Sequence, residues 1–104
     1  MRHQNEEAER SMQLRMGDTL LGSIIVEERD MPWWLGRFEA APEFDSVRPL
    51  FDDWSRAVKA ADDGAMDAAF NALRDLGLVI DRADGAPISR FFLYIDADRV
   101  RLRY

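Results

Sequence analysis

Hydrophobic and polar residues alternate with a period of two through the first part of the chain, and this alternation predicts β-strands. The strands expected from it cover residues 12–16, 19–28 and 33–39. Gly17 and Asp18 predict a tight turn between the first two, and Pro32 stands at the entrance of the third. Three strands are therefore expected before any helix begins.

Neighbouring positions of a strand point to opposite faces of its sheet. In the second expected strand, Leu20, Gly22, Ile24 and Val26 would share one face. The opposite face would carry Leu21 and Ile25, and it is only half polar.

The third expected strand contains two consecutive tryptophans, which must face opposite ways. Phe38 is in phase with Trp34, so Trp34 is the tryptophan expected in the core. Trp33 would then share the other face with Leu35 and Arg37, and Arg37 could stack on its ring.

Beyond Pro42 the apolar residues recur at spacings of three and four, which predicts two helices. Pro49 suits the opening turn, so the first helix is expected to begin near Arg48. Its apolar stripe is Val47, Phe51, Trp54 and Val58, and that of the second helix is Met66, Ala69, Phe70, Leu73 and Leu76. Gly77 is a natural stop for the second helix.

The last part of the chain returns to β structure, with a strand at 78–81, a turn at 83–87 and a hairpin at 89–104. A two-residue connection at Ala97 and Asp98 sets the register of the hairpin, although alanine suits the positive φ of such a turn poorly. One face would pair Ile95 with Val100, Leu93 with Leu102 and Phe91 with Tyr104. The other would pair Asp96 with Arg99, Tyr94 with Arg101 and Phe92 with Arg103.

These elements predict an α+β domain, with a mostly antiparallel sheet of about five to six strands and a two-helix hairpin packed on one face. The expected order is three strands, two helices and three strands. Residues 1–11 are polar and are expected to form a tail or arm, and residues 12–104 a single domain.

Composition narrows the possible chemistry. The chain has 104 residues, a net charge of −6, no cysteine and one histidine, His3, which lies in the polar tail. Thiol catalysis, zinc sites and the usual general base are therefore missing, so no cofactor or metal is expected and an enzyme is the less favoured class. The acidic balance argues against nucleic-acid binding. With no apolar run that could span a bilayer and no secretory signal, we expect a cytoplasmic protein without membrane contact.

If the helices cover one face only, the other face exposes a set of apolar and aromatic side chains beside one arginine. The candidate partner-binding residues are Ile25, Trp33, Leu35, Arg37, Phe92 and Tyr94. Such a patch predicts a surface for a protein partner or for a second copy in a homodimer. The alternative, that the N-terminal arm or the curl of the sheet covers this face, stays open at this point.

A second hypothesis concerns the rim of the sheet, where Glu27, Glu28, Asp30 and Arg37 are expected. Carboxylates beside a guanidinium could hold a divalent cation together with an anionic group. This would make the chain a small-molecule-binding or cation-binding protein, or a small enzyme.

One sequence pattern resembles that of a known group of proteins. Asp30-x-Pro32-Trp33-Trp34-x-Gly36-Arg37-Phe38, followed by Arg48-Pro49-Leu50-Phe51, is similar to a pattern in small acidic bacterial proteins of uncharacterised function. The resemblance extends to the strand around residues 92–96. It implies a domain that stands alone with residues 1–11 peripheral, and it implies no activity, ligand or catalytic residue.

Overall fold

The computed structural model describes residues 11–104. Ser11 already belongs to the first strand. The rest of the tail or arm expected at the N-terminus, residues 1–10, lies outside the described residues.

The described chain is an α+β domain, as predicted. Its elements are β1 (Ser11–Met16), β2 (Thr19–Asp30), β3 (Trp33–Ala40), the 3₁₀-helix η1 (Pro42–Ser46), α2 (Arg48–Ala60), α3 (Asp63–Arg74), β4 (Leu78–Asp81), β5 (Pro87–Ile88), β6 (Phe92–Asp96) and β7 (Arg99–Arg103). The sheet has seven strands, so the prediction of five to six was wrong. The additional strand is β5, whose two residues pair with Asp81 and Ile80. A strand of two residues is too short to show an alternating pattern in the sequence.

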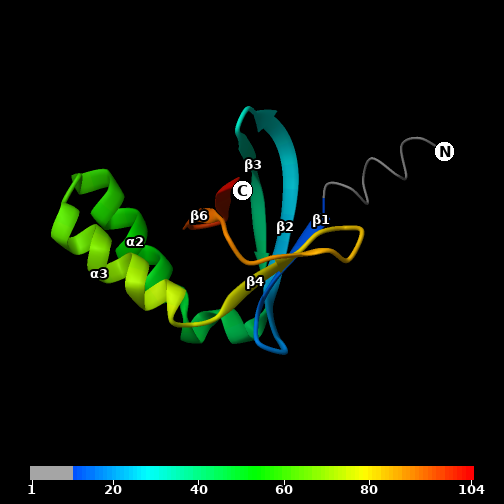
Figure 1. The fold of residues 1–104 in the computed structure, drawn as a ribbon, viewed down its shortest axis with the longest axis horizontal. Helices are drawn as coiled ribbons and strands as arrows, with labels where there is room; N and C mark the ends of the chain where they lie inside the picture. Colours follow the sequence, from blue (N-terminus) through cyan, green and yellow to red (C-terminus); the bar gives the residue numbers. More distant parts are fainter. Residues whose placement is uncertain (1–10) are drawn as a thin grey trace.

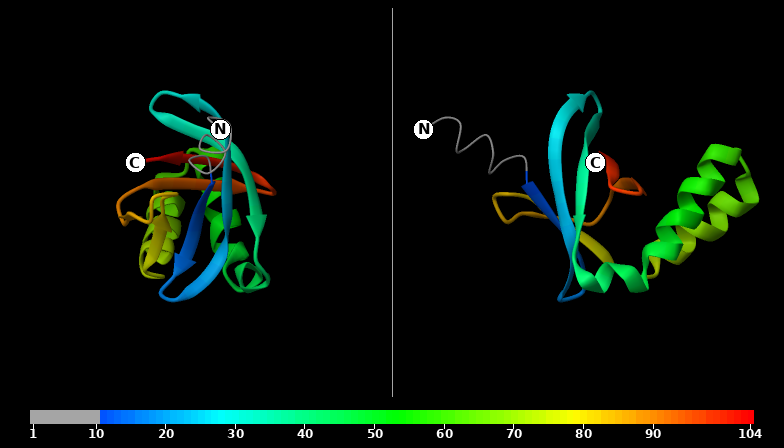
Figure 2. Two further views of the ribbon diagram at one scale, coloured as in Figure 1. Left: turned by 90° about the vertical axis from the view of Figure 1, so that its right-hand side faces the viewer. Right: turned by 180° about the vertical axis from the view of Figure 1, so that it is seen from behind.

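The strands form one antiparallel sheet in the order β5-β4-β1-β2-β3-β7-β6. The strands cross at steep angles, as in a strongly twisted and curled sheet (Figure 2). The helical hairpin of α2 and α3 extends to one side of the sheet (Figure 1).

A β-bulge changes the faces predicted for the start of β2. The pairing of β1 with β2 shifts between Leu14 and Arg15, which leaves Leu21 as the extra residue. Leu21 is consequently buried and Leu20 is 42% exposed, the reverse of a strand that alternates without interruption. The expectation that Leu21 lies on the open face was therefore wrong.

The curled sheet holds the hydrophobic core on its inner face, where Leu14, Ile24, Phe38, Val100 and Leu102 are all buried. Aromatic rings from the helical part complete this core. The ring centroids of Phe38 and Phe44 lie 4.7 Å apart, and those of Phe44 and Phe51 lie 5.3 Å apart. Phe44 comes from η1 and Phe51 from α2, so side chains of these two helices close the open side of the curled sheet.

Helix α2 lies beside β6, the strand at one edge of the sheet. The buried hydroxyl of Ser55 donates a hydrogen bond to the carbonyl oxygen of Ile95 over 3.2 Å. Lys59 forms an ion pair with Asp96 nearby. The first contact gives a backbone carbonyl of the edge strand a hydrogen-bond donor, and the helix covers part of that edge. Unpaired backbone groups at an uncovered edge could otherwise pair with another chain.

The register predicted for the C-terminal hairpin is confirmed over the length of its two strands. Ile95 lies opposite Val100 and Leu93 opposite Leu102, while Tyr94 lies opposite Arg101. The expected pairing of residues 91 and 104 falls outside the strands, because β6 begins at Phe92 and β7 ends at Arg103.

Gly36 allows β2 and β3 to approach beside a second bulge, at Val26 and Glu28. A Cβ atom at Gly36 would lie 1.9 Å from the carbonyl oxygen of Ile25. We predict that Gly36→Ala lowers the free energy of unfolding by about 3 kcal/mol or more, measured by urea denaturation, because a backbone atom cannot move aside cheaply. Gly64→Ala is the matched control, since its nearest neighbour is 3.7 Å away, and it should be neutral or slightly stabilising. Equal stability of the two variants would contradict this account.

Ala97 adopts a φ of 55° in the turn between β6 and β7. A Cβ atom disfavours this left-handed conformation, whereas glycine adopts it freely. We predict that Ala97→Gly raises the free energy of unfolding by about 0.5–1 kcal/mol in the same assay. A fall in stability would show that the turn in solution differs from the one described.

Candidate protein-binding surface

The six candidate partner-binding residues lie on one face of the sheet, which we call the outer face because it is opposite the core. Arg37 pairs with Ile25 across β2 and β3. Leu35 lies opposite Arg101, and Arg101 lies opposite Tyr94. The ring centroids of Trp33 and Tyr94 are 5.7 Å apart, although the two residues are far apart in sequence. The structure thus brings the predicted residues together, while their role in binding stays a prediction.

Two arginines of β7 lie against these rings. The guanidinium carbon of Arg101 is 5.1 Å from the ring centroid of Trp33 and 4.9 Å from that of Tyr94. That of Arg103 is 6.0 Å from the Trp33 ring. We call Trp33, Tyr94, Arg101 and Arg103 the aromatic–arginine surface. Such contacts favour a cation near the face of an aromatic ring.

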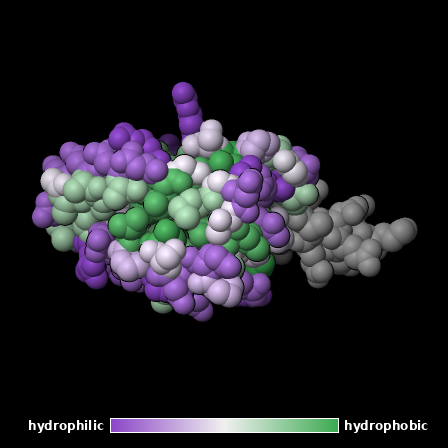
Figure 3. Space-filling model, turned by 90° about the horizontal axis from the view of Figure 1, so that it is seen from below, coloured by the Kyte–Doolittle hydropathy of each residue, from purple (hydrophilic) through white to green (hydrophobic). Residues whose placement is uncertain are grey.

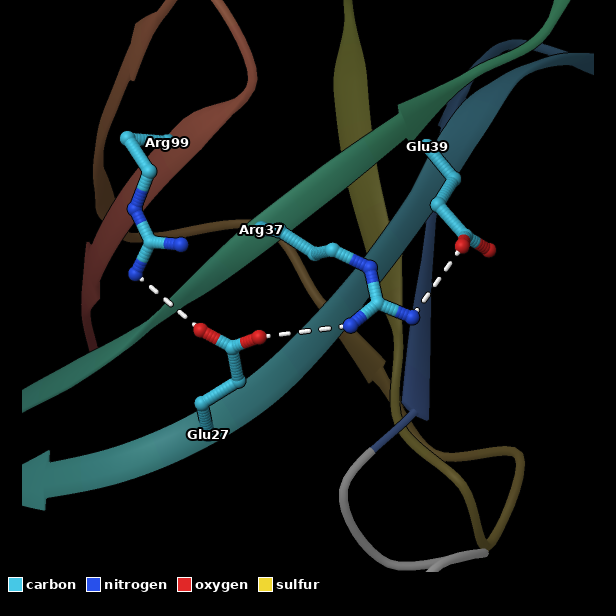
Figure 4. A network of polar contacts seen from close by, with 4 residues as sticks. All are labelled: Glu27, Arg37, Glu39 and Arg99. Atoms are coloured by element: carbon cyan, nitrogen blue, oxygen red, sulfur yellow. Dashed lines mark hydrogen bonds and ion pairs between the residues drawn. The ribbon is translucent and has the colours of Figure 1, made fainter.

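The stacking of Arg37 on Trp33, which the sequence allowed, is not observed. Its guanidinium group instead donates to Glu27 and to Glu39, each over 3.2 Å, and Arg99 donates to the other oxygen of Glu27 over 3.1 Å (Figure 4). The hydrogen bond to Glu39, and then the charge of Glu39, raises the pKa of Arg37, with a smaller contribution from Glu27. A nearby pair of carboxylates attracts a guanidinium more strongly than a neutral ring does.

The helices extend the row of rings beyond what the sequence predicted. Trp54 of α2 stacks on Tyr94 at 5.4 Å with an interplanar angle of 14°. The ring centroid of Phe70 in α3 lies 5.7 Å from that of Trp54 and 6.3 Å from that of Phe92. The periodicity of the helices assigned Trp54 and Phe70 to an apolar stripe, but it could not show that this stripe meets the sheet at β6.

The outer face is not sealed by the described part of the chain. Phe92 is 47% exposed, and Trp33, Leu35 and Tyr94 are half-buried. By contrast, the core ring of Phe44 is only 1% exposed. Of the two possible covers considered from the sequence, the curl of the sheet does not bury these rings, and the N-terminal arm lies outside the described residues.

Trp34, the tryptophan expected in the core, does lie on the inner face. Its side chain packs against the core cluster but is only partly buried. The ring stacks on Tyr104 at 5.9 Å, and the guanidinium group of Arg29 lies over it at 4.1 Å. The two consecutive tryptophans therefore separate as predicted, with Trp33 outside and Trp34 inside.

The rim residues of the second hypothesis do not form a cluster suited to a cation. Both carboxylate oxygens of Glu27 accept from guanidinium groups, so its charge is already balanced. Glu28 and Asp30 are exposed on β2. Within residues 11–104, no group of three or more histidine, cysteine, aspartate or glutamate residues is placed to hold a metal ion.

Comparison of the chain with protein-family models, with curated proteins and with solved structures finds no match. The resemblance to small acidic bacterial proteins therefore stays a prediction. In residues 11–104, neither helix combines the length and the apolar character needed to cross a bilayer.

The ion pairs of Glu27 lead to a prediction on cation binding. Because two arginines already neutralise this carboxylate, adding Mg²⁺ or Ca²⁺ should leave the melting temperature of the chain unchanged within about 1 °C, measured by differential scanning calorimetry. A clear rise that disappears in Glu27→Gln would contradict this prediction and would restore the cation-binding hypothesis.

Proposed function

We propose that the chain is a non-enzymatic protein-binding module that acts through the aromatic–arginine surface. The residues involved include those predicted from the sequence, Ile25, Trp33, Leu35, Arg37, Phe92 and Tyr94, together with Arg101 and Arg103. Tryptophan, tyrosine and arginine are the residue types that most often dominate the binding energy of protein interfaces. On this proposal the chain works in the cytoplasm and needs no cofactor, nucleic acid or membrane.

One observation supports this proposal above the others. Within residues 11–104, Arg101 and Arg103 form no ion pair with a carboxylate, although both lie against aromatic rings. A guanidinium group has five N–H donors and can bind a carboxylate while it remains stacked on a ring. These two arginines therefore have donors to offer a partner.

The neighbouring part of the outer face differs in charge. Glu27 and Glu39 neutralise Arg37 and Arg99 there. The positive charge that remains on this face is consequently at Arg101 and Arg103, beside Trp33 and Tyr94. We infer a protein partner that presents aspartate or glutamate next to an apolar side chain. A second copy of this acidic chain, which would make a homodimer, is the other occupant to be distinguished.

The partner chemistry is tested by selecting random peptides displayed on phage against the immobilised full chain. Selected peptides should carry acidic residues beside aromatic or aliphatic ones. Their affinity should fall at least about tenfold for Arg101→Glu and for Trp33→Ser, measured by biolayer interferometry, because each variant removes a contact typical of interface hot spots.

Two controls make this experiment decisive. Leu20→Ser removes an apolar side chain, 42% exposed, that lies outside the aromatic–arginine surface and should leave peptide affinity unchanged. Light scattering coupled to size exclusion shows whether the chain associates with itself. Basic peptides, peptides that bind Arg101→Glu equally well, or preferential binding of a single-stranded oligonucleotide would each contradict the proposal.

A further inference from the structure

A separate cavity of about 670 Å³ opens where the sheet ends meet the helical hairpin. It lies between the two ends of the strand order, β4 with β5 on one side and β6 on the other, which are not hydrogen-bonded to each other. Its walls come from α2, α3, β4, residues 89–91, β6 and the end of β7. Apolar surface also gathers between the helices and the sheet when the molecule is seen from below (Figure 3).

The lining is mostly apolar, and its charged side chains are all positive. Aromatic and aliphatic side chains, among them Phe51, Leu73, Leu78 and Phe91, make up most of the wall. Arg74, Arg90 and Arg103 are the charged side chains that line it, and no carboxylate side chain does. In a chain with a net charge of −6, a cavity lined by three arginines and no acidic side chain is a local reversal of charge.

The arginines that line the cavity differ in whether a carboxylate lies near the guanidinium group. Arg74 lies 3.7 Å from the neighbouring carboxylate of Asp75. Within residues 11–104, Arg90 forms no ion pair. Arg90 is also exposed, on the segment that joins β5 to β6. Its guanidinium group is therefore available at the mouth of the cavity.

From this geometry we infer that the cavity is a binding site for an amphipathic anion, an apolar chain or ring system that carries one carboxylate or phosphate group. Cavities of this size and apolar character suit small organic molecules. The apolar part would displace water from the aromatic wall, and the anionic group would bind Arg90. The cavity borders the aromatic–arginine surface, and Phe92 and Arg103 belong both to the cavity wall and to the proposed binding residues. The inference is nevertheless tested separately from the proposed function, because it depends on Arg90 and on the rest of the apolar wall, which are not part of that surface.

Decanoate, used below its micellar concentration, is a suitable probe. We expect the full chain to bind it with a dissociation constant on the order of 100 µM, measured by isothermal titration calorimetry. In NMR spectra, amide shifts should concentrate at Leu73, Val79 and Phe91. Decyltrimethylammonium has the same chain with the opposite charge and should bind at least about tenfold more weakly.

Two variants locate the site and its charge preference. Arg90→Gln should weaken decanoate binding about tenfold, whereas Arg82→Gln, which removes the same charge outside the cavity, should not. Ser89→Phe adds a ring to the wall without removing a core residue, and it should abolish binding while preserving the melting temperature. Absence of decanoate binding, equal binding of the two probes, or equal affinity of Arg90→Gln and wild type would overturn the inference.

Discussion

Seven antiparallel strands bend around one apolar interior, and this bend depends on the close approach of backbones at a few positions. Bulges between Leu14 and Arg15 and between Val26 and Glu28 add residues to one strand of each pair. Gly36 admits the carbonyl group of Ile25 where any side chain would collide with it. Because the sheet curls, its inner face encloses most of the core, and buried side chains of η1, α2 and α3, the largest of them Phe44, Phe51 and Trp54, close the open side.

Helices α2 and α3 do not lie across the outer face of the sheet. Helix α2 packs instead against β6, the strand at one edge. Helix α2 lies along β6, where the hydroxyl of Ser55 bonds the carbonyl of Ile95 and the ring of Trp54 stacks on Tyr94. This arrangement protects an edge strand from pairing with other chains. The rings of α2 and α3 reach the outer face only at β6, through Tyr94 and Phe92, and leave Trp33 of β3 and the arginines of β7 uncovered by the helices. The aromatic–arginine surface and the arginine-lined cavity both follow from this placement, one on the outer face and the other where the curl stays open.

The sequence was most informative where contacts are local. Alternation and a short connection were enough to predict the register of the hairpin from β6 to β7, and the phase of Phe38 correctly separated Trp33 from Trp34. Departures from regular alternation, competition between side chains and the packing of the helices on the sheet were missed. A bulge reversed the faces of Leu20 and Leu21, and Arg37 pairs with Glu39 and Glu27 instead of stacking on the Trp33 ring. The stacking of Trp54 on Tyr94 and the cavity depend on how the helices meet β6, and no periodicity in the chain encodes that meeting.

Trp33, Tyr94 and Phe92 reach solvent in the free monomer, whereas Phe44 and Phe51 do not. Hydroxyl-radical footprinting of the full chain, read by mass spectrometry at a concentration where light scattering shows a monomer, tests this directly. We expect rapid oxidation of Phe92 and Trp33, intermediate oxidation of Tyr94 because Trp54 stacks on it, and protection of Phe44 and Phe51. Protection of Trp33 and Phe92 to the level of Phe44 would show that the outer face is covered and would contradict the account.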